Sequence, residues 1–274
     1  MGHGIAYVAL MAGYDVSIAD ADLATLERGE ERIRAAFDAG IQRGKCTPEQ
    51  RDAALARLAS LGSPAEASVE ADLVIEAIPE RLDLKRRLFA DLDALISPGT
   101  ILATNTSSLS VTAIASGARH RDRVIGLHFF NPVPAMRLIE IVRGAETSDE
   151  TTVRARAFAE SLGKTTIVVK DSPGFATSRL GVVLGLEAIR MVEQGVASAE
   201  DIDRAMELGY NHPIGPLKLG DIVGLDVRLG IAVHLHETLK DDTYRPPALL
   251  RSMVAEGKLG KKAGQGFYRW EANP

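Results

Sequence analysis

The chain has 274 residues, 46% of them hydrophobic and 25% charged, so it is long enough for two domains and too apolar to be disordered. Its 32 Lys and Arg against 37 Asp and Glu give a formal net charge of −5. The sequence has no run of Lys and Arg of the kind that predicts contact with nucleic acid. The single cysteine, Cys46, excludes an intramolecular disulfide and a thiolate-cluster metal site. No uncharged apolar run reaches the roughly 20 residues of a membrane span, so we expect a soluble, cytoplasmic protein.

Short apolar runs alternate with longer helical patterns over the first two-thirds of the chain. The runs that we read as buried strands are residues 15–20, 72–77, 100–104, 124–128, 138–142 and 165–169. Strands that alternate with helices are typical of an open α/β sheet, so the sequence predicts this fold class for residues 1–172.

An insert of about residues 23–60 follows the first of these strands, and we read it as a helical hairpin broken near Gly44. Thr47 is placed to cap the second helix, with Pro48 at its first position and Gln50 closing a capping box. The same pattern fits a plain crossover between strands and a protruding arm that contacts substrate. The sequence does not decide between these two interpretations.

Only helical patterns follow residue 172, where Pro173 and Gly174 mark a boundary. The helices that we expect cover about residues 175–193, 199–208, 217–239 and 248–256, which predicts an all-α domain over residues 173–274. The third helix is too apolar to be solvated alone, so it predicts core packing or a homodimer face. Gly181 and Gly185 are expected to be close-packing glycines.

The chain opens with a helix start typical of dinucleotide-binding folds, Met1-Gly-His-Gly-Ile-Ala6. Gly2 takes the place of the third fingerprint glycine, and Asp20 ends the next strand at the spacing of the acid that binds ribose hydroxyls. A carboxylate there repels a 2′-phosphate and so favours NAD over NADP. We therefore expect a Rossmann-like doubly wound sheet, with its first strand and first two glycines upstream of Met1 in the natural protein.

Four further segments resemble the L-3-hydroxyacyl-CoA dehydrogenases, including bacterial 3-hydroxybutyryl-CoA dehydrogenases, in order and spacing. They are Asn105-Thr-Ser-Ser-Leu109, His128-Phe-Phe-Asn-Pro-Val-Pro134 with Glu140, Lys170-Asp-Ser-Pro-Gly-Phe175 and Gly260-Lys-Lys-Ala-Gly-Gln-Gly-Phe-Tyr268. The resemblance covers nearly the whole chain and includes no hydratase-like region, so it implies the single-function form. It implies an enzyme that uses NAD to interconvert a short (3S)-3-hydroxyacyl-CoA and its 3-oxoacyl-CoA.

The resemblance implies catalytic roles for three side chains at or near strand ends. His128 would take the substrate's hydroxyl proton, because a neutral imidazole accepts a proton near neutral pH. Glu140 would orient that imidazole and stabilise its charged form, and Ser107 would hydrogen-bond the substrate oxygen. Each side chain also has a structural alternative: a satisfied strand-end histidine, an exposed strand acid and a helix cap, respectively.

The resemblance also implies cofactor and substrate contacts by position. Besides Gly2 and Asp20, the cofactor contacts carried over are Glu80, Lys85, Ser107, Asn131 and Lys262. For Glu80 and Lys85 the alternative is a solvated start of a helix over residues 80–95. One position departs from the family, which commonly has Asn where this chain has Ser178. The resemblance places that residue near the histidine and the substrate oxygen.

A metal mechanism is not expected, because the only close pair among the six histidines, His234 and His236, points to different faces of a helix. Two classes of function remain. The leading prediction is an NAD-dependent dehydrogenase of acyl-CoA substrates that forms a homodimer through its C-terminal domain, with a dehydrogenase of another hydroxy acid as a variant. The alternative is a truncated, non-catalytic binding or assembly protein, which the absent first strand motivates.

Overall fold

The computed structural model describes residues 1–271 of the chain, which divides into two compact units at the junction of Ser172 and Pro173. Each unit has its own hydrophobic core. Of the helices in the described residues, none is both long and apolar enough to cross a membrane.

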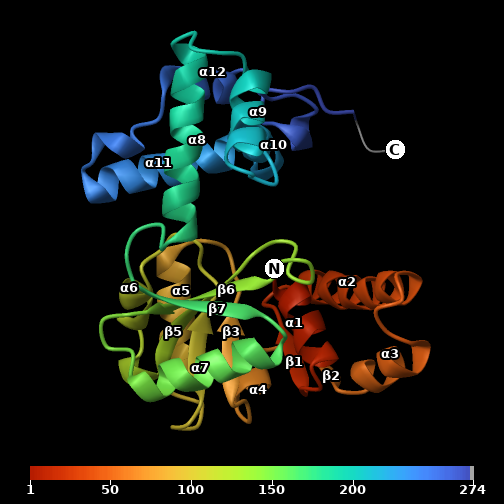
Figure 1. Cartoon of the computed structure of the whole chain (residues 1–274). Helices are drawn as coiled ribbons and strands as arrows, with labels where there is room; N and C mark the ends of the chain where they lie inside the picture. The colour runs from red at the N-terminus through yellow and green to blue at the C-terminus, as the bar shows by residue number, and fades with distance from the viewer. Residues whose placement is uncertain (272–274) are drawn as a thin grey trace. The chain divides into compact units, whose positions relative to one another are not determined.

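The first unit is an α/β domain with seven strands in two sheets (Figure 1). One sheet pairs β1 (Val16–Ala19) with β2 (Leu58–Leu61), and the other has the order β3 (Leu73–Glu76), β4 (Ile101–Thr104), β5 (Val124–Phe129), β6 (Leu138–Arg143), β7 (Thr165–Lys170). All pairs are parallel except β5 with β6, which is antiparallel. The sequence predicts no strand direction for residues 138–142, and the structure makes β6 antiparallel to β5.

The pairing of the strands agrees with a Rossmann-like order. The β2–β1 and β3–β4–β5 groups correspond to the two halves of the expected sheet, on either side of the expected first strand. The two sheets are separate in the described residues, and a strand upstream of Met1 stays a prediction.

Helices connect these strands in chain order. They are α1 (Gly2–Met11), α2 (Leu23–Gln42), α3 (Pro48–Leu55), α4 (Pro64–Ser68), α5 (Leu82–Asp93), α6 (Val111–Ala115), the short η1 (Arg121–Arg123) and α7 (Asp149–Ser161). The capping box predicted at Thr47 and Gln50 is confirmed. The boundary of the insert is corrected, because residues 58–61 form β2. The hairpin of α2 and α3 thus connects two parallel strands, as a crossover does.

The core of this domain lies on the central strands. The side chains of β4 and β5 are buried throughout, as is typical of strands covered on both faces. From the helices, Ile33 and Phe37 of α2 and Leu10 of α1 are fully buried. Burial of each such side chain contributes about 1.5–3 kcal/mol of transfer free energy. This burial holds the central strands in place, and with them the polar residues at the strand ends.

The second unit is helical from residue 177 onward. Its helices are α8 (Thr177–Glu193), α9 (Ala199–Gly209), α10 (Pro216–Val223), α11 (Leu225–Leu239), η2 (Asp242–Tyr244), α12 (Ala248–Ala255) and η3 (Lys261–Ala263). The single helix expected over residues 217–239 is two helices, because Gly224 has φ 107° and ends α10. Only glycine adopts that conformation without strain, so the helix axis changes direction there.

Two buried charged side chains, Arg228 and Asp221, organise the packing of the second unit. Arg228 of α11 packs against α8, and a Cβ at Gly185 would lie 1.9 Å from its guanidinium nitrogen. Close packing is thus confirmed at Gly185 but not at Gly181, where a Cβ would meet nothing within 4 Å. Asp221 of α10, which is fully buried, accepts hydrogen bonds from Phe267 N (3.0 Å), Tyr268 N (2.9 Å) and Trp270 Nε1 (2.9 Å).

Candidate active site

Strand register brings His128 and Glu140 together. The two residues are directly opposite each other in the antiparallel β5–β6 pair, and opposite residues project to the same face of a sheet. His128 Nδ1 lies 2.7 Å from Glu140 Oε2, and the two side chains are only 8% and 0% exposed. A histidine and a carboxylate 12 residues apart in the chain thus form a buried, hydrogen-bonded pair.

The carboxylate determines which nitrogen of His128 carries the proton. An ionised carboxylate only accepts hydrogen bonds, so beside one Nδ1 is the donor, and an imidazole that is neutral there has its basic lone pair on Nε2. The ring of Phe130 packs on the imidazole with the centroids 4.5 Å apart. The imidazole is therefore oriented by a charge on one edge and an aromatic ring on its face.

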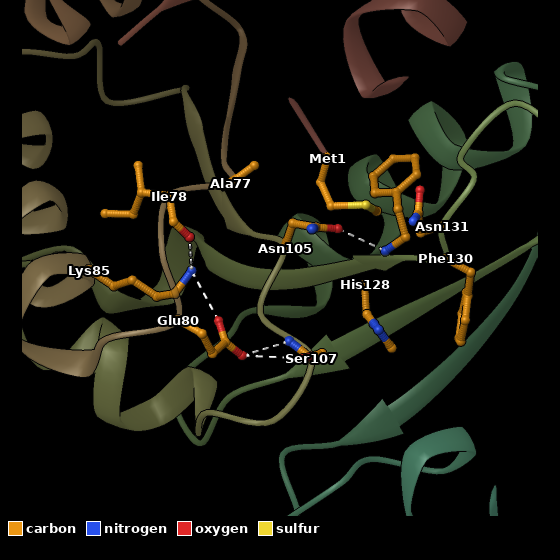
Figure 2. A pocket seen from close by; sticks show the side chains of 11 residues that line it. Met1, Ala77, Ile78, Glu80, Lys85, Asn105, Ser107, His128, Phe130 and Asn131 are labelled. Atoms are coloured by element: carbon orange, nitrogen blue, oxygen red, sulfur yellow. Dashed lines mark hydrogen bonds and ion pairs between the residues drawn. The ribbon is translucent and has the colours of Figure 1, made fainter. Parts of the chain in front are cut away.

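His128 lines a cavity of about 340 Å³ at the carboxyl ends of β3, β4 and β5 (Figure 2). The cavity is lined by Met1, Ala77, Ile78, Glu80, Lys85, Asn105, Ser107, His128, Phe129, Phe130 and Asn131. Open α/β sheets bind their ligands at this end of the strands. The predicted residues Glu80, Lys85, Ser107, His128 and Asn131 thus share one cavity, which is large enough for part of a ligand.

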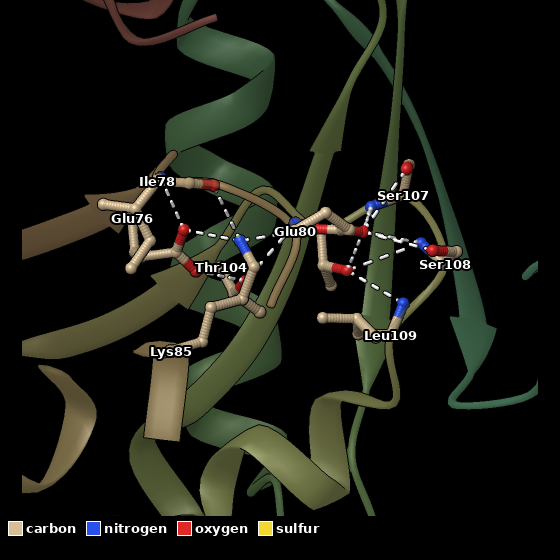
Figure 3. Close-up of polar contacts among 9 residues, drawn as sticks. Glu76, Ile78, Glu80, Lys85, Thr104, Ser107, Ser108 and Leu109 are labelled. Carbon is tan, nitrogen blue, oxygen red and sulfur yellow. Dashed lines mark hydrogen bonds and ion pairs between the residues drawn. The ribbon is translucent and has the colours of Figure 1, made fainter. Parts of the chain in front are cut away.

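Glu80 binds the loop that carries Ser107 (Figures 2 and 3). Its Oε1 accepts hydrogen bonds from Thr106 Oγ1 at 2.6 Å, Ser107 N at 2.9 Å and Ser108 N at 3.2 Å. Burial raises the pKa of Glu80, but the hydrogen bond from Thr106 and the charge of Lys85 outweigh it and hold that pKa below its usual range. The carboxylate is therefore ionised and organises the loop.

Lys85 is buried between two carboxylates. Its Nζ lies 2.6 Å from Glu76 Oε1 and 3.3 Å from Glu80 Oε2, and its side chain is 1% exposed. Glu76 also accepts from Ile78 N and from Thr104 Oγ1, both at 2.7 Å. A solvated helix start was thus the wrong alternative for Lys85, and Glu76 is a charged neighbour that the sequence reasoning missed. Glu76 could have been found from its place at the end of an apolar strand, because a buried carboxylate is costly unless a cation or hydrogen-bond donors pair with it.

Both units are similar to domains of known proteins. Residues 1–172 match the model of the 3-hydroxyacyl-CoA dehydrogenase NAD binding domain, and residues 174–270 match that of the 3-hydroxyacyl-CoA dehydrogenase C-terminal domain. The chain belongs to the 3-hydroxyacyl-CoA dehydrogenase family. It is an NAD-dependent enzyme with an NAD-binding domain followed by a helical C-terminal domain.

Individual family members cover almost the same length. A protein of Bacillus subtilis strain 168 named "Probable 3-hydroxybutyryl-CoA dehydrogenase" is 45% identical over 271 residues, which are 99% of this chain and 94% of that protein. The 3-hydroxybutyryl-CoA dehydrogenase of Mycobacterium tuberculosis strain H37Rv is 42% identical over 98% of this chain and 95% of its own. The solved (S)-3-hydroxybutyryl-CoA dehydrogenase of Ralstonia eutropha superposes with a TM-score of 0.95 at 41% identity, over 99% and 96% of the two chains.

Asp20 and Gly2, the predicted cofactor contacts outside the cavity, lie at the end of β1 and the start of α1. Asp20 directly follows β1, is half-buried and accepts a hydrogen bond from Asp22 N at 3.0 Å. Gly2 begins α1, and a Cβ there would make an ordinary van der Waals contact, 3.9 Å from Ala77 Cβ. The tighter position is Gly4, where a Cβ would lie 3.1 Å from Val133.

Ser178 and Lys262 belong to the second unit. Ser178 is half-buried in the first turn of α8, and Lys262 in η3 pairs with Asp226 at 2.6 Å. Their predicted contacts with substrate and cofactor stay predictions. In the described part of the chain, no group of three or more His, Cys, Asp or Glu side chains is placed to hold a metal ion.

Proposed function

We propose that the chain oxidises (3S)-3-hydroxyacyl-CoA to 3-oxoacyl-CoA, with the short 3-hydroxybutyryl-CoA as its substrate and His128 as general base. The observation that carries this proposal is the buried His128–Glu140 pair at the wall of the cavity. A neutral imidazole held by a carboxylate is suited to moving one proton near neutral pH.

Oxidation of a secondary alcohol removes a proton from oxygen and a hydride from carbon. Nε2 of His128 takes the hydroxyl proton, and the electron pair of the O–H bond becomes the second bond of the new carbonyl. The bound NAD supplies the hydride acceptor. Glu140 stabilises the resulting imidazolium, which returns the proton when the reaction runs toward the hydroxy compound. Ser107 at the same cavity donates a hydrogen bond to the substrate oxygen, and Ser178 is the second polar contact that we propose for it.

The residues around the cavity fit an NAD molecule. Asp20 would accept the hydrogen bonds of the adenosine ribose, and the start of α1 at Gly2 would face the pyrophosphate. We assign Glu80, Lys85, Ser107 and Asn131 to the nicotinamide half, because they line the cavity that contains His128. Lys262 is proposed as a further cofactor contact. A cavity at the carboxyl ends of the strands is where such a fold binds a dinucleotide, so the position of these residues suits this cofactor.

The test is reduction of acetoacetyl-CoA by NADH, followed at 340 nm with the purified chain. We expect turnover with the wild type and a fall in kcat of about 10²-fold or more in His128→Ala, because that variant lacks the imidazolium that donates a proton to the carbonyl oxygen during reduction. NADH affinity, measured by fluorescence titration, should stay nearly unchanged. A chain that binds NADH but reduces neither acetoacetyl-CoA nor another 3-oxoacyl-CoA would favour the binding or assembly alternative. Little effect of His128→Ala on turnover would remove His128 from the mechanism.

A further inference from the structure

Three charged side chains lie in a row, and two of them line the cavity (Figure 3). Glu76 at the end of β3 binds Lys85 of α5, and Lys85 binds Glu80 in the loop between those elements. Glu80 and Lys85 line the cavity, and Glu76 is the inner member of the row. We refer to these three residues as the acid–lysine–acid cluster.

Hydrogen bonds indicate that both acids of the cluster are ionised. Glu76 accepts from the Lys85 ammonium, from Ile78 N and from Thr104 Oγ1, and all three groups donate. Glu80 accepts from a loop hydroxyl and from two loop N–H groups besides its contact with Lys85. Carboxylates with only donors around them remain charged, so the cluster has two negative charges and one positive charge.

Two of the three members of the cluster are buried from solvent. The side chains of Glu76 and Lys85 are each 1% exposed, and Glu80 is 36% exposed at the cavity. Among the ion pairs within residues 1–271, neither acid has a cation other than Lys85. Because water screens a buried charge poorly, this excess charge acts on whatever occupies the cavity.

We propose that the net negative charge of the acid–lysine–acid cluster, of which Glu76 is the inner member, strengthens binding of the oxidised cofactor, NAD⁺, relative to NADH. The inference rests on the proposed function, which puts the nicotinamide in the cavity that contains His128. The nicotinamide ring is a cation in NAD⁺ and neutral in NADH, whereas the rest of the molecule is the same. A fixed negative charge beside the ring therefore attracts only the oxidised form.

Binding of the two cofactor forms tests this directly. Dissociation constants for NAD⁺ and NADH are measured by titration calorimetry on the wild type and on Glu76→Gln, which keeps the shape of the side chain and removes its charge. We expect the ratio of Kd for NAD⁺ to Kd for NADH to rise about fivefold in Glu76→Gln, mainly through weaker NAD⁺ binding.

Two variants separate charge from structure. Glu76→Asp retains the charge, so it should keep the wild-type ratio even where the shorter side chain lowers the melting temperature. Asp83→Asn removes a carboxylate from the first turn of α5, the helix that carries Lys85. Asp83 is half exposed and paired with Arg81, so water screens its charge. The ratio of the two dissociation constants should therefore stay within about twofold of the wild type.

Two results would overturn the proposal. Equal weakening of NAD⁺ and NADH by Glu76→Gln would assign Glu76 a structural role only, and an unchanged ratio would show that its charge does not reach the ring. Should Glu76→Gln fail to fold, Glu80→Gln takes its place. Loss of a ribose contact at Glu80 weakens both forms alike, and only loss of charge changes the ratio. Since the readout is binding, absence of acyl-CoA turnover contradicts the proposed function and leaves this test intact.

Discussion

At the scale of single residues, the chemistry of the site depends on one hydrogen bond, from His128 Nδ1 to Glu140 Oε2. In the mechanism that we propose, that bond fixes the tautomer of the ring and puts a negative charge beside the imidazolium. Both functions require a carboxylate, since an amide is uncharged and can present its NH₂ group to the ring instead.

Glu140→Gln tests this dependence. We expect kcat for acetoacetyl-CoA reduction to fall by about 10²-fold or more, because the imidazolium loses its counter-charge. NADH affinity should be retained, since Glu140 is fully buried and does not line the cavity. A variant with near wild-type kcat would show that the carboxylate only fills space in the sheet.

Ser178→Asn restores the residue that the family commonly has at this position. An asparagine is longer than serine and offers both a donor and an acceptor, so under the proposed function we expect it to contact the substrate oxygen without a bridging water. We expect kcat/KM for acetoacetyl-CoA to stay the same or to rise. A fall of more than about tenfold, equivalent to about 1.4 kcal/mol, would count against placing Ser178 at the substrate.

The sequence was sufficient to find side chains that stand in a motif, and insufficient for those that do not. His128, Glu140 and Ser107 stand in segments whose order resembles the family. Glu76 is a lone acid in an apolar run, and its partners Lys85 and Thr104 are 9 and 28 residues away. The register of β3 with β4 puts Glu76 opposite Thr104, and Lys85 reaches Glu76 from α5.

At the scale of elements, strands were predicted correctly where a run of apolar residues includes β-branched side chains, which favour strands. Strands β1 and β3 to β7 follow runs of apolar residues, many of them β-branched, and all are close to the predicted ranges. The strand β2 was missed because Leu-Ala-Ser-Leu has no β-branched residue and follows a helix without a turn signal. The antiparallel β5–β6 pair was missed because apolar composition alone carries no information on strand direction.

The glycine-rich C-terminal segment owes its composition to Asp221. A Cβ at Gly266 would lie 2.1 Å from the Asp221 carboxylate, which accepts three hydrogen bonds from the segment. Gly266→Ala should therefore lower the stability of the second unit by about 1–3 kcal/mol through overpacking, seen as a lower melting temperature. Gly230→Ala is the matched control, since a Cβ on this residue of α11 meets nothing within 4 Å. It should leave stability unchanged or raise it, and an equal loss in both variants would contradict this role of Gly266.

At the scale of the whole molecule, we propose that two copies associate through the helical unit. Large apolar side chains are exposed on three helices that pack on one another, α8, α10 and α11. They are Leu180, Leu184, Leu219, Ile222, Val223 and Val227. Exposed apolar side chains gathered on helices that pack together are typical of a protein interface, and isologous dimers are the commonest assembly.

Ile222→Lys introduces a charge into this face and tests the homodimer. We expect the wild type to sediment as a dimer and Ile222→Lys as a monomer, because a lysine ammonium buried at an interface has no counter-ion there. Leu208→Lys on α9 is the control, since Leu208 is exposed but lies on a different helix, and that variant should remain dimeric. A wild type that sediments as a monomer, or dissociation of both variants alike, would exclude the α8–α10–α11 face as the site of association.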